Sequence, residues 1–294
     1  MPASRRSSCA TAASFADFSS AAAPEAFADI FKLLIEERFL RSQLQPRDYT
    51  LRVLQCMRVL MRDEAHRAMF VTLGGAMVLV RQFADLAHEH CSHPHAEFAS
   101  EMLVETLSIL KRFAALEELC PTRNAAHACD LDAVSPADAL RLQRGLVALL
   151  STREALVLQC VLVAIQQFVQ LGPHLTAIGQ LGCAEILLRI LIDYEASFRV
   201  LAAELLVPLL SERTFLKDVV LHDGAGALLS AVNTEDSALQ LPLLRALDAI
   251  QRRLPQARRS PDGDRRAADL RLQGFPDHSG AGSENSKACR LVFG

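Results

Sequence analysis

The residues most able to do chemistry are gathered in one short stretch, HEHCSHPH, at positions 88–95. It holds four of the nine histidines in the chain and one cysteine, namely His88, His90, Cys91, His93 and His95. Imidazole nitrogen and thiolate sulfur are donors that zinc and copper prefer, and a tetrahedral site needs three or four donors around one ion. These five residues are therefore the metal-ligand candidates, and their convergence depends on the element that carries them.

The rest of the chain lacks the motifs of hydrolytic enzymes. It contains no GxSxG nucleophile elbow and no HExxH zinc motif. His174 and His222 fall at predicted helix junctions, where a capping or solvated role is expected. The adjacent acids at 36–37 and 117–118 are typical of solvated helix faces. The sequence therefore predicts no catalytic residue and no cofactor.

A recurring helical unit must position the candidate ligands. It consists of an apolar helix, a short polar stretch and a glycine-marked junction that opens a second apolar helix. It occurs as LRVLQCMRVLMRDEAHRAMFVTLGGAMVLVRQF, ALVLQCVLVAIQQFVQLGPHLTAIGQLGCAEILLRIL and FRVLAAELLVPLLSERTFLKDVVLHDGAGALLSAV. Gly182 and Gly224, at equivalent junctions, lie 42 residues apart. This period is typical of armadillo or HEAT-type repeats, whose units bury their apolar faces by stacking on neighbours.

Composition and helical spacing favour the same architecture. The 294 residues are 51% hydrophobic but only 5% aromatic, which favours helix over a β-sandwich. Ile186, Leu187 and Ile190 fall on one helical stripe that needs a partner helix. Pro208 is predicted to kink its helix, and Pro242 to occupy the first turn of the next one. We therefore predict an all-α fold, a right-handed armadillo/HEAT-type α-solenoid of about four units.

The predicted repeat domain occupies residues 25–254. A helix at 26–40 would cover the apolar face of the first unit. A polar, proline-containing insertion at about 117–138 interrupts the array as a long loop. The Ser- and Ala-rich residues 1–24 and the Arg-, Asp-, Ser- and Gly-rich residues 255–294 are predicted to be disordered ends.

The cysteines and the first residues bear on location. The eight cysteines are scattered and form no CxxC pair, which predicts reduced thiols and a cytoplasmic protein. An organellar location is the alternative, because residues 1–23 carry Arg5 and Arg6 and no acid before Asp17. Those features are typical of a transit peptide.

Charge and hydropathy exclude two classes of partner. Residues 1–250 have a net charge of −7 and residues 251–294 one of +4, whereas nucleic-acid binders need clustered basic residues. The longest uncharged apolar run, 155–184, contains five glutamines and the helix-breaking pair Gly172-Pro173. We therefore predict no nucleic-acid partner and no membrane span.

The position of HEHCSHPH in this array weakens the metal hypothesis. The stretch follows the second helix of the first clear unit and precedes the helix near Glu97, so it is predicted to be an inter-repeat loop. His88 and His90 would lie at a fraying helix end on different faces, and Pro94 would stop regular structure. Because nothing supplies a second shell, we predict no metal site.

Two long stretches of the array resemble a known family. They are LRVLQCMRVLMRDEAHRAMFVTLGGAMVLVRQFADLAHEH and AEILLRILIDYEASFRVLAAELLVPLLSERTFLKDVVLHDGAGALLSAV. In helix order, and in the LMRD, LGG and AELL elements at 60–63, 73–75 and 203–206, the chain resembles an armadillo region preceding the kinase domain in the NIMA-related serine/threonine kinases. The resemblance covers roughly Phe27 to Leu254.

The resemblance implies repeats that dock or regulate a serine/threonine kinase. This chain departs from the family in having no kinase domain, since it contains no GxGxxGxV loop, VAIK lysine, HRD loop or DFG triplet. The insertion at 117–138 is also longer than the loop of the family. The chain itself is therefore predicted not to be an enzyme.

The concave surface of the predicted solenoid is the expected binding surface. Armadillo proteins that bind extended basic peptides often carry an asparagine ladder on their inner helices, but the segments assigned here as inner, 76–86, 142–150, 183–193 and 225–232, contain no Asn. An importin-like role is therefore disfavoured. We expect a non-catalytic module that binds a basic or amphipathic protein segment. The alternative is a generic ciliary or trafficking scaffold unrelated to kinases.

Overall fold

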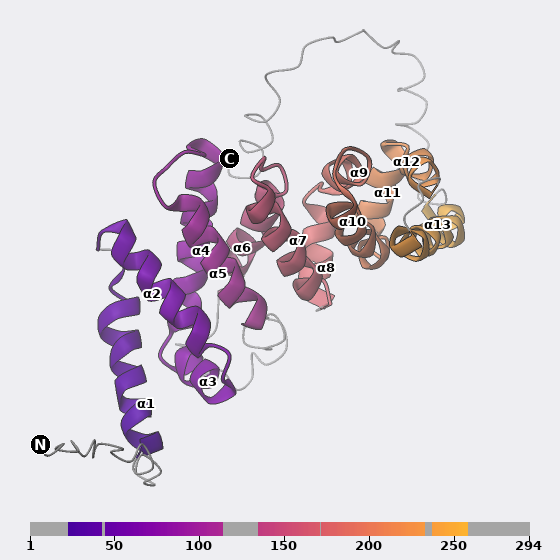
Figure 1. Ribbon diagram of the computed structural model, residues 1–294. Helices are drawn as coiled ribbons and strands as arrows, with labels where there is room; N and C mark the ends of the chain where they lie inside the picture. Colours follow the sequence, from indigo (N-terminus) through magenta and orange to yellow (C-terminus); the bar gives the residue numbers. More distant parts are fainter. Residues whose placement is uncertain (1–22, 43–44, 114–134, 171, 233–236, 258–294) are drawn as a thin grey trace, which may run out of the picture.

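The computed structural model describes residues 23–42, 45–113, 135–170, 172–232 and 237–257. Within those ranges every regular element is a helix, from α1 (Ala23–Leu33) to α13 (Ser237–Ala257). The prediction of an all-α solenoid is confirmed, because the helices stack in an elongated array instead of closing around one centre (Figure 1).

The array begins with a helix that ends in a π-helical turn. α1 runs directly into a π-helical turn, η1 (Leu34–Phe39), and α2 (Arg47–Leu60) follows. The Ser42 hydroxyl donates to the Phe39 carbonyl at 2.7 Å and so satisfies one carbonyl at the end of the turn. The predicted helix at 26–40 corresponds to α1 and η1 together.

The helices after α2 form three units of three helices each and one unit of two helices. The first unit comprises α3 (Glu64–Thr72), α4 (Gly75–Ser92) and α5 (Ala99–Phe113). Next come α6 (Pro136–Leu149) and α7 (Ala155–Phe168). The last two units are α8 (Gly172–Gln180), α9 (Ala184–Asp193) and α10 (Ala196–Leu209), then α11 (Arg213–Leu221), α12 (Gly224–Val232) and α13.

The last helices of successive units pack on one another along the whole array. α2 packs on α5, α5 on α7, α7 on α10, and α10 on α13. We call this row the third-helix ladder. A parallel row is made by the second helices, in which α4 packs on α6 and α9 on α12. Each unit thus buries its apolar face against its neighbours, as in other repeat proteins.

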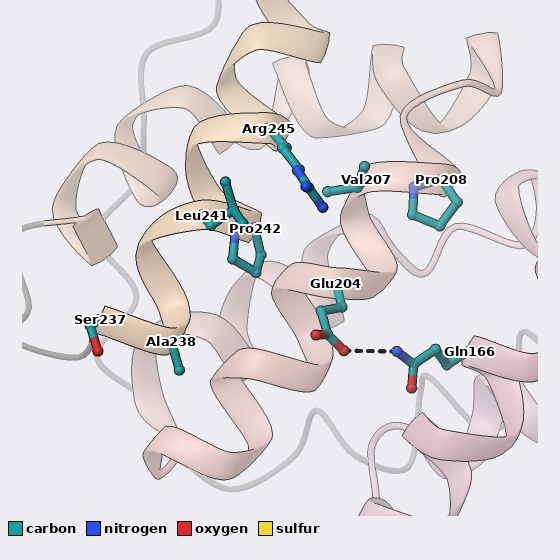
Figure 2. A pocket seen from close by; sticks show the side chains of 9 residues that line it. All are labelled: Gln166, Glu204, Val207, Pro208, Ser237, Ala238, Leu241, Pro242 and Arg245. Carbon is teal, nitrogen blue, oxygen red and sulfur yellow. Dashed lines mark hydrogen bonds between the residues drawn. The ribbon is translucent and has the colours of Figure 1, made fainter.

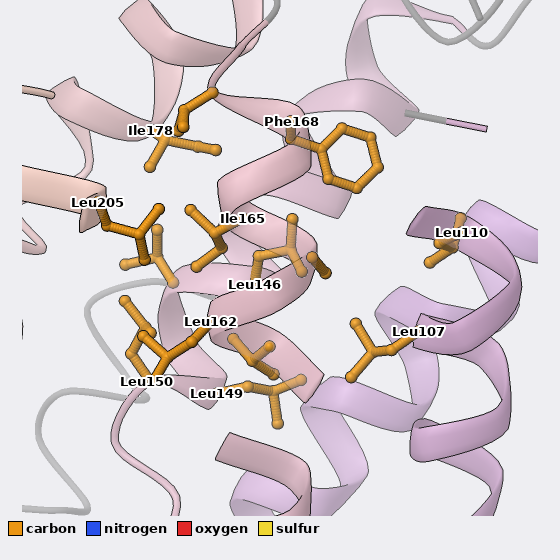
Figure 3. Close-up of a cluster of buried hydrophobic side chains, with 14 of the residues drawn as sticks. Leu107, Leu110, Leu146, Leu149, Leu150, Leu162, Ile165, Phe168, Ile178 and Leu205 are labelled. Carbon is orange, nitrogen blue, oxygen red and sulfur yellow. The ribbon is translucent and has the colours of Figure 1, made fainter. Parts of the chain in front are cut away.

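One hydrophobic core runs between the two rows. At its centre, Leu107 of α5, Leu146 of α6 and Leu162 of α7 interdigitate with no more than 1% of each residue exposed (Figure 3). At the α2 end, Phe70 packs between two other phenylalanines, with ring centroids 5.0 Å from Phe39 and 5.5 Å from Phe113. Branched aliphatic side chains at helical spacing therefore dominate the packing, as the sequence predicts.

The junctions between helices correct one detail of the repeat assignment. Gly74 and Gly182 have left-handed φ angles of 76° and 72°, whereas at the third junction the residue with positive φ is Asp223, at 50°. Gly224 instead begins α12, where a Cβ would lie 2.3 Å from Val219 Cγ1. Gly182 and Gly224 are therefore not equivalent. Asp223 can take the place that Gly74 and Gly182 have at the other junctions, because its short side chain tolerates the left-handed region.

One of the two proline predictions is wrong. Pro208 was expected to kink its helix; it lies inside α10, which ends at the next residue, Leu209, and the kink stays a prediction. Pro242 was expected in a first turn, but α13 already begins at Ser237. Helix ends depend on packing against the neighbouring unit, which local sequence does not specify.

The predicted boundaries can be compared with the described helices. The positions 25 and 254 fall within α1 and α13, and α6 begins at Pro136, before the predicted end of the insertion at 138. Most of the predicted disordered ends and of the insertion lies outside the described residues.

Candidate functional site

The five metal-ligand candidates do not form a site. α4 extends to Ser92, so His88, His90 and Cys91 belong to a helix and not to the predicted loop. Among the described residues, which include all five candidates, no group of three or more His, Cys, Asp or Glu side chains could hold a metal ion. His90 points away from the face that His88 and Cys91 share, and His93 and His95 lie beyond the end of α4, which is why proximity in sequence misleads here.

His90 has a structural place between two units. It is buried, and its Nε2 lies 2.9 Å from Thr152 Oγ1 in the turn before α7. Burial lowers the pKa of the imidazole, and the nearby charge of Glu154 only partly opposes this. His90 thus links the last turns of α4 to the turn before α7.

His174 and His222 differ from each other. His174 is buried in α8, where its Nδ1 lies 2.8 Å from Gln143 Nε2 of α6 and its ring packs at 5.1 Å from Phe168. The prediction of a capping or solvated role is wrong for this residue, because the α6–α8 contact encloses it. His222 does follow the end of α11 in an exposed position, as predicted.

The most enclosed carboxylate also has a structural role. Asp138 is 3% exposed and accepts hydrogen bonds from Arg81 Nη2 at 3.1 Å and from Ser135 Oγ at 2.8 Å. Burial alone would raise its pKa, but these two hydrogen bonds and the charges of Arg81 and Arg141 outweigh burial and hold the pKa below its usual range. The interactions cap α6 and fasten it to α4.

A hollow on the third-helix ladder is the strongest candidate for a functional site. It is a pocket of about 470 Å³ where α7, α10 and α13 meet (Figure 2). Its walls come from all three helices, and its lining residues are Gln166, Glu204, Val207, Pro208, Ser237, Ala238, Leu241, Pro242 and Arg245. A hollow at a ladder of parallel helices is a surface along which an extended chain segment could lie.

Polar groups stand on one wall of this pocket. Gln166 Nε2 donates to Glu204 Oε2 at 2.7 Å, so an α7 amide orients an α10 carboxylate (Figure 2). Glu204 remains exposed, and its second oxygen can accept from a cationic group. Pro208 has no N–H, so it cannot give the Glu204 carbonyl the usual helical hydrogen bond. The wall therefore presents acceptors in a hollow with an open side.

Apolar side chains and one cation complete the opposite side. Leu241 of α13 is 56% exposed, although it lines the pocket with Val207 and Pro242. Arg245, one turn further along α13, extends toward Val207 (Figure 2). The pocket thus combines an acceptor, a donor and exposed apolar surface, which is the mixture that amphipathic segments require.

The hollow lies on a different row of helices from the one assigned as inner from sequence. The segments 76–86, 142–150, 183–193 and 225–232 belong mainly to α4, α6, α9 and α12, whereas the pocket lies on α7, α10 and α13. The reason is physical, because both rows are apolar and helical, and only stacking decides which row surrounds the hollow. The helices of the ladder also contain no Asn.

No single described helix is both long enough and apolar enough to cross a membrane. Two pairs, α3 with α4 and His174–Gln180 with α9, reach that length and composition only when the two members are counted together, and each pair is bent by 83°.

Comparisons with known sequences give a distant relative. No protein-family model matches the chain. The chain is 28% identical over 203 residues to the serine/threonine-protein kinase Nek10 of mouse (Mus musculus) and to that of human (Homo sapiens). The match covers 67% of this chain, but only 17% of the mouse kinase and 16% of the human one. Because this chain contains no kinase motif, the shared region is non-catalytic.

Solved structures identify the fold. An engineered protein matches with a TM-score of 0.54 at 18% identity, over 90% of this chain and 94% of that one. A designed armadillo repeat protein in complex with the peptide (KR)4 gives 0.54 at 13% identity, over 90% and 98%. Computationally designed armadillo repeat proteins for modular peptide recognition give 0.52 at 13% identity, over 90% and 98%. The fold is therefore of the armadillo-repeat type.

Proposed function

We propose that this chain is a non-catalytic peptide-binding module that uses the third-helix ladder to dock a partner protein and to regulate a NIMA-related kinase. The pocket on α7, α10 and α13 carries the proposal, because it joins an exposed carboxylate to exposed apolar surface on the ladder. The distant similarity to Nek10 outside the catalytic domain supports the link to a kinase.

The chemistry of the pocket selects the class of segment. Glu204, held by Gln166, would accept from a lysine or arginine of the partner, and Leu241 and Val207 would cover an adjacent apolar side chain. Arg245 would donate to backbone carbonyls of the segment. The partner is thus a basic, amphipathic stretch in extended form, which agrees with the peptide (KR)4 in one designed armadillo protein of the same fold.

Peptide titration tests the binding surface. With the purified 294-residue chain, we expect fluorescence anisotropy to detect a labelled (KR)4 peptide and not an acidic (DE)4 peptide. Glu204→Gln should weaken the (KR)4 complex by about tenfold, because it removes a charge-assisted hydrogen bond. The matched control is Glu185→Gln, which removes an exposed carboxylate from α9, outside the ladder. Equal loss in both variants would contradict a site at Glu204.

The kinase link needs a separate experiment. We expect the chain to bind the separately purified catalytic domain of mouse Nek10 and to change its rate of phosphate transfer to a test peptide. Binding of (KR)4 without any effect on the kinase would favour a generic ciliary or trafficking scaffold instead. Phosphate transfer from ATP by the chain alone would contradict its non-catalytic role. A cytoplasmic location is part of this proposal, and fluorescence microscopy of the tagged chain tests it.

A further inference from the structure

Four arginines converge at the opposite end of the ladder from the pocket. Arg58 lies in the last turn of α2, Arg62 in the turn that follows, Arg67 in α3, and Arg112 in the last turn of α5. They come together because α2 packs on α5 and the chain then reverses into α3 (Figure 1). We call these four residues the arginine cluster.

The cluster contains more positive charge than its neighbours balance. Arg58 Nε lies 2.5 Å from Glu105 Oε2, so one guanidinium has a carboxylate partner. Asp63, next to Arg62 in sequence, lies against the His66 ring, 3.5 Å from its Nδ1. Burial, and after it the charges of Arg62, Arg67 and Arg58, lower the pKa of Arg112. The cluster thus has an unfavourable electrostatic energy that an anion would relieve.

Structural roles account for only part of the cluster. Arg67 Nη1 donates to the carbonyls of Met61 and Arg62, at 3.1 and 2.9 Å, and so closes the end of α2. Arg62 is exposed in its turn. Arg112 Nε is buried and has no hydrogen-bond partner within the described part of the chain. A buried guanidinium donor without an acceptor is costly, which favours a ligand that supplies one.

We propose that the arginine cluster binds the phosphoryl group of a phosphorylated serine or threonine in a partner protein. A phosphoryl group carries a charge of about −1.5 to −2 and three acceptor oxygens, which suits several convergent guanidiniums better than a single carboxylate does. Arg112 and Arg62 supply the donors that the fold does not use, and Arg58 and Arg67 supply charge at the rim. The site makes the ladder responsive to phosphorylation of its partner, which goes beyond docking of a basic segment.

The surroundings of the cluster favour a phosphorylated protein over other anions. Residues 1–250 carry a net charge of −7, so an anionic membrane or a nucleic-acid backbone would meet repulsion over most of the surface. A single phosphoryl group needs only the local positive charge. The cluster also lies beside α5, on the same ladder that carries the pocket, so one extended partner could pass from one site to the other.

Paired peptides provide the test. With the full 294-residue chain, anisotropy would compare two labelled Gly/Ala peptides that differ only in a central phosphoserine or serine. We expect the phosphorylated peptide to bind at least about tenfold more tightly. In ¹⁵N spectra the Nε–Hε signal of Arg112 should shift on its addition. Arg112→Gln and Arg62→Gln should each remove most of the preference, and Arg62→Gln in its exposed turn keeps the test valid if Arg112→Gln unfolds the chain.

The matched control removes an arginine from the same helix as Arg58. Arg52 is exposed on α2 and pairs with Asp48, so Arg52→Gln should leave the preference unchanged. The proposal is overturned if both peptides bind equally or if Arg52→Gln has the same effect as Arg62→Gln. Stabilisation by inorganic phosphate without a peptide preference would mean an adventitious ion only. Preferential binding to phosphoinositide vesicles would assign the cluster to a lipid headgroup. None of these outcomes affects the test at Glu204, which lies on α10.

Discussion

At the α2–α5 end of the ladder four arginines lie near one another and only Arg58 is paired with a carboxylate among the described residues, whereas at the α10–α13 end an exposed carboxylate shares a pocket with leucine, proline and valine. Both ends are made from the same kind of helix, packed in the same way on its neighbours. Leu54 of α2 and Leu206 of α10 are both fully buried. The difference teaches that the buried stripe sets the architecture, and the outward positions are free to carry opposite chemistry.

The largest expected effect comes from a substitution in the hydrophobic core that supports both ends. Leu162 of α7 is fully buried at the centre of the core, and Leu162→Ala should lower the free energy of unfolding by about 2–5 kcal/mol. Circular dichroism during urea denaturation measures this. Leu156→Ala, at an exposed position of the same helix, should change it by less than about 0.5 kcal/mol. If Leu162→Ala loses (KR)4 binding and phosphopeptide binding at clearly different urea concentrations, the two ends do not depend on one shared core.

Charge reversal at each end should separate the two recognition chemistries. Glu204→Lys should weaken (KR)4 binding by more than about tenfold, or ~1.4 kcal/mol, and leave the phosphopeptide unaffected. Arg62→Glu should do the reverse. Anisotropy titration of both variants with both peptides gives the four values. If either reversal weakens both peptides equally, the two ends are not independent.

Protonation of His90 should destabilise the contact between α4 and the turn before α7, which lies between the two ends. Its folded-state pKa lies below the ordinary value of 6.5, so the unfolded chain binds more protons at mildly acidic pH. Its contribution to stability is therefore complete above about pH 6.5 and is lost as the pH falls through the lowered folded-state pKa. Urea denaturation from pH 7.5 to 5.5 should show this loss in the wild type and less of it in His90→Gln. His222→Gln, at an exposed site, should keep the wild-type profile.

The smallest expected effect concerns an exposed ion pair that belongs to neither the pocket nor the arginine cluster. Arg52 and Asp48 lie 3.9 Å apart on the surface of α2, with 78% and 54% of their side chains exposed. Arg52→Gln should therefore lower the free energy of unfolding by no more than about 0.5 kcal/mol, as measured by urea denaturation at low salt. A larger decrease in the free energy of unfolding would show that the total charge of the α2 end, and not the geometry of the arginine cluster, distinguishes it from the pocket end.

Much of the fold could be predicted because its signals are local. Apolar side chains at helical spacing, such as Ile186, Leu187 and Ile190, indicate helices, and their recurrence indicates stacking. The extent of α4 could not be predicted, because His90 is held in place by Thr152, a residue far away in sequence. The row of helices around the hollow was missed for the same reason, since it depends on contacts between units.

The sites were harder to predict than the fold. Gln166, Glu204 and Arg245 come from three helices and form no motif; the local signals were Pro208 and Pro242, two prolines that both line the pocket. The arginine cluster was hidden by the net charge of −7 over residues 1–250, which says nothing about the local convergence of Arg62 and Arg112. Surface chemistry on a solenoid is a property of neighbouring units and not of any one stretch of sequence.

The third-helix ladder has a further consequence for how the molecule opens. Because each of its helices packs on the one before and the one after, α2 and α13 lie far apart (Figure 1), and the described part of the array behaves as a one-dimensional chain. Local unfolding should begin at the outer units and proceed inward, so amide hydrogen exchange should be slowest in α7 and faster toward α2 and α13. A ligand bound at either end would then slow the unfolding of the whole array, because it raises the free energy needed to open the outer unit first.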